Sequence, residues 1–279
     1  MSDADKASLP ALELLFERPD LPTSGLPEAL VRAYAGELGV SGPRVFANFV
    51  GSLDGVVALP GPAESGHVIS QDSEADRFVM GLLRACADAV VIGAGTFRRS
   101  PAHLWQAGSI YPPAAELFAQ VRERLGLQPQ PKLVVVSASG ALDVARPALA
   151  DAVIVTSVSG ASKLRPVLPP EARLVVLDLQ NLRLSEVISR LQSEGLPRLL
   201  TEGGPSLFAR LVSEQLVDEL FLTASPALFG RVANDQRKSL VDGLDVAGTQ
   251  LDLLSARRHG SHLFLRYALR RMRIPSVVP

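Results

Sequence analysis

Short apolar runs alternate with stretches of helical spacing along most of this chain. The runs predict buried strands and read RVFANFV, DAVVIG, KLVVVS, AVIVTS, RLVVLD, RLLTEG and DELFLTA. Between them, apolar residues recur three or four positions apart and predict helices near Phe78 to Cys86, Leu117 to Leu125, Leu184 to Leu191 and Leu207 to Val212. This alternation predicts βαβ units, and therefore an α/β fold with a mostly parallel sheet covered on both faces.

The first part of the chain differs in composition and in its pattern of apolar residues. Residues 1–42 are rich in Pro, Ala, Gly and Leu, show no strand alternation and predict one short helix from Pro27 to Leu38. We therefore predict an N-terminal extension over 1–42, a single domain over 43–273 and a short tail over 274–279.

The C-terminal part predicts an antiparallel hairpin. Leu251 to Arg258 and His262 to Leu269 are strand-like segments that flank Gly260. His259 and His262 fall in the predicted turn, and the chain's four histidines show no convincing ligand spacing. We expect no metal site.

Charge and composition exclude several classes of protein. With 28 basic and 29 acidic side chains the formal charge is −1, which argues against a general nucleic-acid or acidic-membrane surface protein. The apolar runs are too short to cross a bilayer, and the start MSDADKASLP lacks the features of a signal peptide. The single cysteine, Cys86, suits a reducing compartment, so we expect a cytoplasmic protein in which Cys86 packs in the core.

Two glycine-rich turns each follow a predicted strand and precede a predicted helix. They are Gly93-Ala94-Gly95-Thr96 and Glu202-Gly203-Gly204-Pro205-Ser206. Each alone is more often a tight connection, but two in one α/β domain favour a dinucleotide whose pyrophosphate meets helix amides. Neither turn is the GxGxxG fingerprint, so a standard Rossmann site is not expected.

Arg98 and Arg99 directly follow the first turn. They are candidates to contact the extra phosphate of NADPH, and a solvated helix face is an equally good interpretation.

A third element, Ser52-Leu53-Asp54-Gly55, follows the strand RVFANFV. Asp-Gly favours a simple turn, although α/β proteins also place ligand contacts at the carboxyl ends of strands. Asn48 lies four residues before Ser52 and therefore shares its strand face.

Five ordered blocks carry a family resemblance. The blocks are NFVGSLDG, HVISQDSEADRF, LRACADAVVIGAGT, LLTEGGPSL and DELFLTASPALFG. In this order and spacing the chain resembles the riboflavin-biosynthesis pyrimidine reductase family over roughly Arg44 to Arg270. The resemblance implies a dihydrofolate-reductase-like three-layer sandwich.

The resemblance also implies chemistry and site residues. NADPH would donate a hydride to a ribosylamino-pyrimidine 5′-phosphate, whose ribose becomes a ribityl chain. The implied cofactor residues are Gly93, Gly95, Thr96, Ser137, Ser139, Glu202, Gly203, Gly204 and Ser206. Ala94 and Pro205, within the two turns, and Arg98, after the first, join them as candidates from the sequence itself. The implied substrate residues are Asn48, Ser52, Asp54 and Ser70. Of the acids, Asp54 is the first choice and Glu202 the second for moving the proton that the reaction needs.

The chain departs from the family pattern in two places. One cysteine and a short preceding segment exclude the zinc deaminase domain of bifunctional members, and Asn48 fits the stand-alone branch. The loop Arg99 to Trp105 lacks the arginine that helps to fix the substrate in many members. Arg77 and Arg84, seven residues apart on one helix face, are candidate replacements, with a solvated stripe as the alternative.

Two other functions remain open at this point. A reductase of the same fold that acts on dihydrofolate or another pterin would also consume NADPH, and an inactive nucleotide-binding module would bind it without turnover.

The family implies a homodimer acting on a small-molecule substrate, without nucleic-acid or membrane partners. The exact pyrimidine, diamino-pyrimidinone or aminouracil, stays open.

Overall fold

The computed structural model describes residues 9–61, 64–177, 183–232 and 235–270. Its strands are β1 (Glu13–Glu17), β2 (Arg44–Ser52), β3 (Val56–Ala58), β4 (Ala89–Gly93), β5 (Lys132–Ser137), β6 (Val153–Thr156), β7 (Arg173–Val176), β8 (Arg198–Thr201), β9 (Glu219–Ser225), β10 (Lys238–Ser239), β11 (Leu251–His259) and β12 (His262–Leu269). Its α-helices are α1 (Glu28–Tyr34), α2 (Ser65–Ser70), α3 (Glu74–Ala85), α4 (Ala94–Arg99), α5 (Ala107–Ile110), α6 (Ala115–Arg124), α7 (Val158–Leu164), α8 (Leu184–Ser193) and α9 (Pro205–Ser213).

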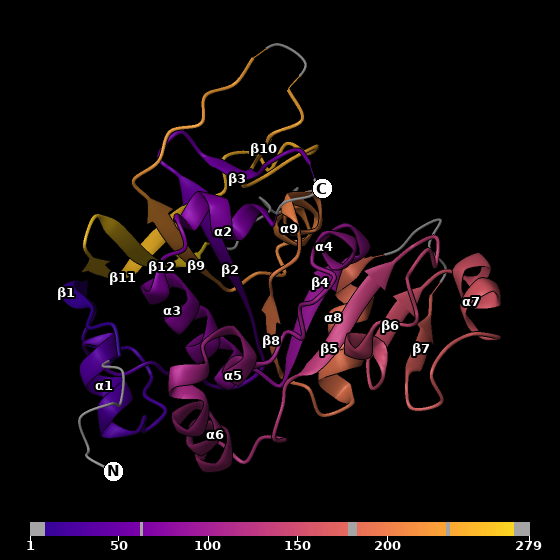
Figure 1. Ribbon diagram of the computed structural model, residues 1–279, viewed down its shortest axis with the longest axis horizontal. Helices are drawn as coiled ribbons and strands as arrows, with labels where there is room; N and C mark the ends of the chain where they lie inside the picture. The colour runs from indigo at the N-terminus through magenta and orange to yellow at the C-terminus, as the bar shows by residue number, and fades with distance from the viewer. Residues whose placement is uncertain (1–8, 62–63, 178–182, 233–234, 271–279) are drawn as a thin grey trace, which may run out of the picture.

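Ten of these strands form one sheet in the order β1-β11-β12-β9-β2-β8-β4-β5-β6-β7 (Figure 1). Neighbours from β9 to β7 are parallel, and neighbours from β1 to β9 are antiparallel. The predicted α/β fold, with a mostly parallel sheet and a C-terminal antiparallel hairpin, is therefore confirmed. The small sheet formed by β3 and β10 was not predicted, because both strands are too short to show a pattern.

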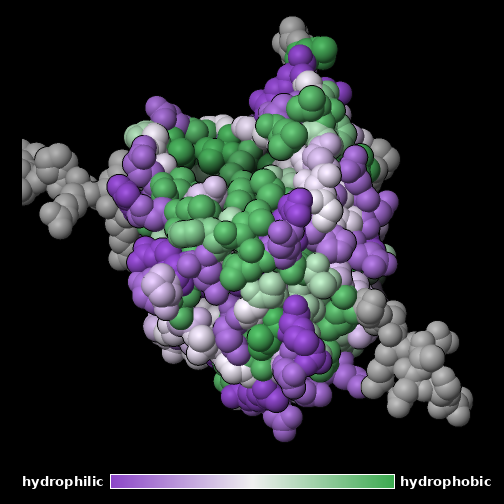
Figure 2. Space-filling view, turned by 90° about the vertical axis from the view of Figure 1, so that its left-hand side faces the viewer, coloured by the Kyte–Doolittle hydropathy of each residue, from purple (hydrophilic) through white to green (hydrophobic). Residues whose placement is uncertain are grey.

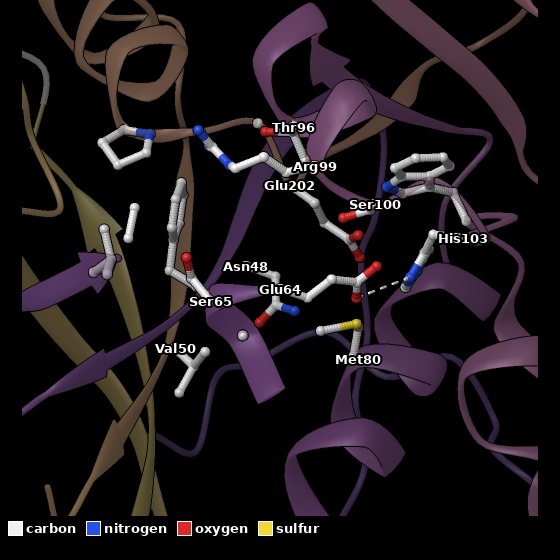
Figure 3. A pocket seen from close by; sticks show the side chains of 18 of the residues that line it. Asn48, Val50, Glu64, Ser65, Met80, Thr96, Arg99, Ser100, His103 and Glu202 are labelled. Carbon is white, nitrogen blue, oxygen red and sulfur yellow. Dashed lines mark ion pairs between the residues drawn. The ribbon is translucent and has the colours of Figure 1, made fainter. Parts of the chain in front are cut away.

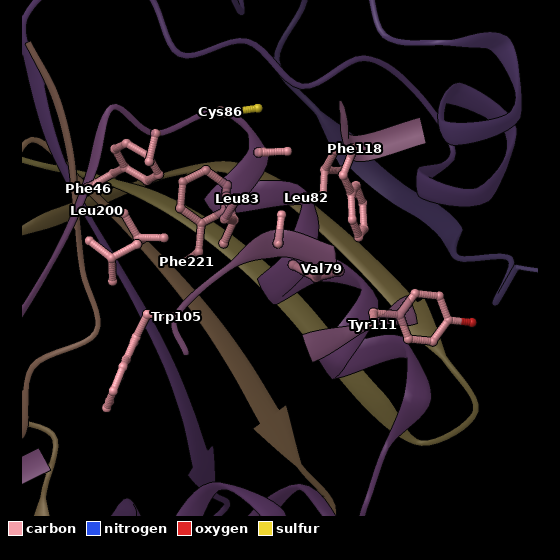
Figure 4. Close-up of a cluster of buried hydrophobic side chains, with 14 of the residues drawn as sticks. Phe46, Val79, Leu82, Leu83, Cys86, Trp105, Tyr111, Phe118, Leu200 and Phe221 are labelled. Carbon is pink, nitrogen blue, oxygen red and sulfur yellow. The ribbon is translucent and has the colours of Figure 1, made fainter. Parts of the chain in front are cut away.

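Helices pack on both faces of the sheet and make three layers. One apolar cluster joins the sheet to α1, α3, α5 and α6, and a second joins it to α8 and α9. Successive residues of β2 alternate between them: Phe46 belongs to the first cluster, and Val45 and Ala47 belong to the second. Figure 4 shows the first cluster, where Cys86 at the end of α3 is fully buried, which confirms its predicted core position.

The N-terminal segment continues the sheet. Contrary to the expectation of no strand before residue 42, β1 pairs antiparallel with β11, with Phe16 opposite Ala256. Leu30 in α1 is fully buried, and the Arg257 Nε of β11 donates to the Tyr34 carbonyl at 2.7 Å. The expectation was wrong because β1 is held by a partner strand at the other end of the chain, not by an alternating pattern of its own.

Two further sequence expectations concern the ends and the membrane. The predicted tail, 274–279, lies outside the described residues. Among the helices that the structure describes, none combines the length and the apolar character needed to cross a bilayer.

Candidate functional site

A cavity of about 170 Å³ opens at the carboxyl ends of β2 and β8. Its walls come from these strand ends, from α3 and α4, and from the loop that follows α4. Figure 3 shows Thr96 and Arg99 at one end of the cavity, with Asn48 and Met80 at the other. Segments far apart in the sequence meet here because parallel strands all end at the same edge of the sheet.

An ion pair between Arg84 of α3 and Glu202 after β8 forms part of the cavity wall. Arg84 Nε donates to Glu202 Oε1 at 2.9 Å, and Nη2 donates to Oε2 at 2.6 Å. Arg84 Nη1 donates to the Gln106 carbonyl at 3.2 Å, and the side chains of the pair are only 1% and 9% exposed. The solvated-stripe interpretation of Arg84 is therefore wrong. Its guanidinium is largely occupied within the protein, which limits Arg84 as a phosphate anchor.

His103 extends this network toward Glu64. Its Nε2 lies 2.8 Å from Arg84 Nη2, and because a guanidinium only donates, Nε2 accepts and the ring proton resides on Nδ1. Burial, followed by the charge of Arg84, lowers the pKa of His103 to about 3. The ring is therefore neutral in the physiological range, with Nδ1 at 4.0 Å from Glu64 Oε2 (Figure 3).

The two glycine turns converge at the other end of the cavity. A Cβ added to Gly204, the N-cap of α9, would lie 3.3 Å from Thr96 Oγ1 and 3.7 Å from Arg99 Nη2. Pro205 occupies the first turn of α9, where its missing N–H costs nothing. The Arg99 side chain has no hydrogen bond or ion pair among the described residues, and it lines this cavity and a neighbouring one that also contains Asp235 and Asp242.

Ser137 and Ser139 lie beyond this cavity, at the end of β5. The Ser137 side chain is buried, and its Oγ has no hydrogen-bond partner among the described residues. Ser139 is exposed and accepts from the Ala141 N–H at 3.3 Å. Arg98 is also exposed, and its Nη1 donates to the Ala141 carbonyl at 3.5 Å.

Asp54 lies outside the cavity wall. Its carboxylate accepts from the Gly230 N–H at 2.6 Å, from the Phe229 N–H and from Ser52 Oγ. The pKa of Asp54 is lowered below its usual range, mainly by the hydrogen bond from the Ser52 hydroxyl and also by those from the two amides. These contacts tie the turn after β2 to the loop after β9, and a catalytic role for Asp54 stays a prediction.

Arg77 and Ser70 also lie away from the cavity. Arg77 Nη1 donates to the Asp72 carbonyl at 2.8 Å, and Ser70 Oγ donates to the His67 carbonyl at 3.3 Å. The cavity brings together part of the predicted set, namely Asn48, Arg84, Thr96, Glu202, Gly203, Gly204 and Pro205. The remaining predicted residues do not line it: Ser52, Asp54, Ser70, Arg77, Gly93, Ala94, Gly95, Arg98, Ser137, Ser139 and Ser206.

Most of this chain matches one known protein family. The family described as RibD C-terminal domain matches residues 43–265. The chain belongs to the RibD C-terminal domain family. This membership confirms the resemblance that the five sequence blocks indicated.

A curated relative is similar over most of its own length. It is the 2,5-diamino-6-ribosylamino-4(3H)-pyrimidinone 5′-phosphate reductase of Archaeoglobus fulgidus, 30% identical over 192 residues, which are 67% of this chain and 82% of the relative. The chain is accordingly an oxidoreductase of the RibD C-terminal domain family.

Solved structures show the same fold at lower identity. A pyrimidine reductase-like protein from Corynebacterium diphtheriae matches with a TM-score of 0.65 and 23% identity, over 82% of this chain and 93% of that one. RibD of Acinetobacter baumannii matches with a TM-score of 0.64 and 18% identity, over 82% of this chain and 59% of that one.

Several cavity residues of this RibD C-terminal domain were missed in the sequence. Asp76 on α3 was read only as part of a sequence block, although its spacing from Val79 and Leu83 places an acid on a buried helix face. Glu64 and His103 lie in loops, where no periodicity identifies a side chain that points inward. Their placement depends on long-range packing.

Proposed function

We propose that this chain reduces the ribosylamino group of a pyrimidine 5′-phosphate to a ribitylamino group in riboflavin biosynthesis, with NADPH as reductant. The observation that carries the proposal is one cavity lined both by Asn48 and Arg84, from the expected substrate set, and by Gly204, from the expected cofactor set. The name of the Archaeoglobus fulgidus relative supports the substrate class.

The residues present fit a dinucleotide. Gly204 has no side chain where a Cβ would press on the Thr96 hydroxyl, which leaves room for a pyrophosphate beside the first amides of α9. Arg99 offers a guanidinium to the same anion, and Ser137 and Ser139, at the end of β5, stay our candidates for the adenosine end. Arg98 stays our candidate for the extra phosphate that distinguishes NADPH from NADH. When bound, the cofactor supplies the hydride that goes to C1 of the opened sugar.

The protein's own groups must position the sugar and supply a proton. As the ribosylamine opens to an imine, the ring oxygen gains a proton, so an acid or a water relay must face the cavity. Because Arg84 donates to both of its carboxylate oxygens, Glu202 is not the acid itself; it lines the cavity, which Asp54 does not, and is therefore better placed than Asp54 to orient the water that carries the proton. His103 serves as a neutral hydrogen-bond donor through Nδ1, not as an acid.

The test is anaerobic oxidation of NADPH or NADH with three substrates in parallel. They are the diamino-ribosylamino-pyrimidinone 5′-phosphate, its aminouracil counterpart and dihydrofolate. Oxidation with either pyrimidine supports the proposal. Oxidation with dihydrofolate alone favours the pterin reductase, and NADPH binding without turnover of any of the three favours an inactive module.

We also propose that the protein is a homodimer. The antiparallel side of the sheet exposes large apolar side chains, and Figure 2 shows such side chains gathered on this side of the molecule; they are Leu14, Leu15, Phe16, Leu251 and Leu253. Light scattering should give twice the chain mass, and Phe16→Glu should give a monomer. A monomeric wild-type protein would contradict this assembly.

A cytoplasmic location completes the proposal. The single, buried cysteine is compatible with a reducing compartment, where NADPH is available. A fusion of the chain to a fluorescent protein, imaged in cells, tests this location.

A further inference from the structure

The loop between α4 and α5, residues 100–106, lacks the arginine that the family resemblance implies, and it brings His103 to the cavity wall instead. The ring is largely buried, and its Nε2 lies 2.8 Å from Nη2 of the fully buried Arg84. The proposed reaction uses His103 only as a donor through Nδ1. The contact that Nε2 makes with Arg84 therefore needs an explanation of its own.

Aromatic packing fixes the position of the His103 ring. The ring lies against Trp105, with centroids 4.9 Å apart, and Trp105 in turn stacks on Phe97 of α4 at 5.8 Å. Trp105 is buried, and its φ of +55° lies in the left-handed region, which bulky side chains rarely adopt. Backbone strain of this kind persists only where the surrounding packing enforces it, so the loop is held in one conformation.

The loop and Glu202 hold two adjacent edges of the Arg84 guanidinium. Nε and Nη2 donate to the two oxygens of Glu202. Nη1 donates to the Gln106 carbonyl at 3.2 Å, and Nη2 also donates to His103 Nε2. A guanidinium has five N–H groups and accepts nothing, so these contacts use four of its five donors.

Without the acceptor at His103, Arg84 would have an unused N–H beside other carboxylates. Glu64 and Asp76 line the same cavity as Glu202. A buried guanidinium with an unsatisfied donor moves toward the nearest available acceptor, and a carboxylate is the strongest of these. Such a move would break the paired contact that fixes the Glu202 oxygens.

His103 can hold this Arg84 donor because its ring is neutral. Burial first, and then the charges of Arg84 and His67, lower the pKa of His103 to about 3. Glu64 Oε2 faces the other side of the ring, 4.0 Å from Nδ1, which favours the ring proton on Nδ1 and leaves Nε2 as the acceptor (Figure 3). An imidazolium would instead repel the guanidinium.

We propose that His103 is a positioning residue: its Nε2 holds Arg84 in place, and Arg84 holds the Glu202 carboxylate that orients the proton-carrying water. The inference depends on the proposed function and deepens it. When the sugar ring opens, the C1–O bond breaks, its electron pair stays on oxygen, which takes one proton, and nitrogen shares its lone pair with C1. The hydride then adds to C1 and returns that pair to nitrogen. Each turnover consumes one proton, so the water that delivers it must be held in place.

Two substitutions of His103 separate the acceptor from the ring. His103→Leu removes the acceptor, whereas His103→Gln keeps an oxygen that reaches the position of Nε2. We expect His103→Leu to lower kcat about 10- to 100-fold, the cost of a small misplacement in an active site, with little change in the KM of the pyrimidine. The solvent deuterium isotope effect on kcat should rise in His103→Leu, because proton delivery becomes slower. His103→Gln should keep a kcat and an isotope effect close to those of the wild type.

His67→Leu is the matched control. His67 also faces Glu64, with Nε2 3.5 Å from Oε2, but its side chain is about half exposed and does not line the cavity. Its kcat and isotope effect should equal those of the wild type. Equal losses in the two His103 variants would assign the effect to packing of the ring and overturn the positioning role. Full activity of His103→Leu, or a lower kcat with an unchanged isotope effect, would also overturn it.

Nitrogen-15 NMR of the wild-type histidines gives a second test if His103→Leu does not fold. The His103 signal, identified by its loss in His103→Gln, should show a proton on Nδ1 only and no titration between about pH 5 and 8. A ring that titrates in this range would carry two N–H donors when protonated and would release Arg84, which would overturn the inference. Turnover of neither pyrimidine by the wild type would instead overturn the proposed function, and the positioning role with it, even where the ring is neutral.

Discussion

Arg84 and Glu202, 118 positions apart in the sequence, form a bidentate ion pair with N–O distances of 2.9 and 2.6 Å in the cavity wall. Neither side chain is more than a tenth exposed. The pair joins α3 to the turn after β8 and fixes the Glu202 carboxylate at the end of the parallel strands. The same ion pair therefore stabilises the fold and holds a candidate functional carboxylate in place.

Removing one partner of this pair should be strongly destabilising. Arg84→Met or Glu202→Gln leaves a buried, unpaired or poorly paired group, and we expect each to lower the free energy of unfolding by about 3–5 kcal/mol. Urea unfolding measures this loss. The double variant Arg84→Met/Glu202→Leu should recover much of the stability without recovering turnover, and strictly additive losses would show that the pair is not coupled.

A carboxylate at the second glycine turn should weaken cofactor binding. Gly204 has φ −65°, so a side chain there introduces no backbone strain. Gly204→Asp places a negative charge beside the expected pyrophosphate and should weaken NADPH binding about tenfold or more, which is at least ~1.4 kcal/mol. Fluorescence titration measures the affinity, and Gly204→Ala, which adds the same Cβ beside Thr96 without a charge, separates the steric part of the loss from the electrostatic part. Equal affinity in the Asp variant would remove this turn from the cofactor site.

Asp54→Asn should lower turnover more than NADPH affinity. The variant weakens the hydrogen bonds that the carboxylate accepts from the Gly230 and Phe229 amides, so the loop after β9 is held less firmly. Parallel measurements of kcat and of the NADPH dissociation constant separate the two effects. Asp20→Asn, which changes an exposed carboxylate in an ion pair with Arg18, is the control and should alter neither. Full activity of Asp54→Asn would end the role assigned to this residue.

The same carboxylate predicts a direction of pH dependence. Because the pKa of Asp54 is lowered in the folded protein, its contribution to loop order is present above the usual aspartate range and is lost as the pH falls through the lowered value. Limited proteolysis after Phe229 should therefore accelerate at acidic pH in the wild type. Asp54→Asn should already be cleaved at that faster rate at neutral pH.

Cys86 should be chemically inert in the folded protein. Burial raises the pKa of its thiol to about 12, so almost no thiolate forms near neutral pH. A thiol reagent should label the cysteine only after unfolding. Cys86→Ala should keep full activity and lose about 1 kcal/mol of stability, and a folded but inactive variant would contradict a purely packing role.

The N-terminal segment should behave as part of the core. Leu30→Ala in α1 deletes a fully buried side chain and should cost about 2–5 kcal/mol in urea unfolding. Leu228→Ala is the matched control, since this leucine is 75% exposed and its change should stay within about 0.5 kcal/mol. Equal free energies of unfolding for the two variants would mean that the N-terminal segment does not contribute to the stability of the core.

The sequence by itself was enough to locate most strands and helices along the chain, and the C-terminal hairpin. Strands such as β5 are continuous apolar runs because both faces are covered, and helices such as α3 show an apolar stripe. The glycine turns could be located too, since glycine at a strand-to-helix junction is a local signal. β1 escaped prediction because an edge strand with one neighbour needs no strong pattern of its own.

Only the tertiary structure decided which polar residues share the cavity. Asp54 looked functional because it follows a strand, yet its oxygens are used by loop amides, whereas Asp76 was not singled out in the sequence and lines the cavity. Arg84 looked like a free cation and is paired with Glu202. Periodicity reports which face of an element is apolar, but the partner of a polar side chain depends on contacts between distant segments, and those contacts exist only once the sheet has brought its strand ends together.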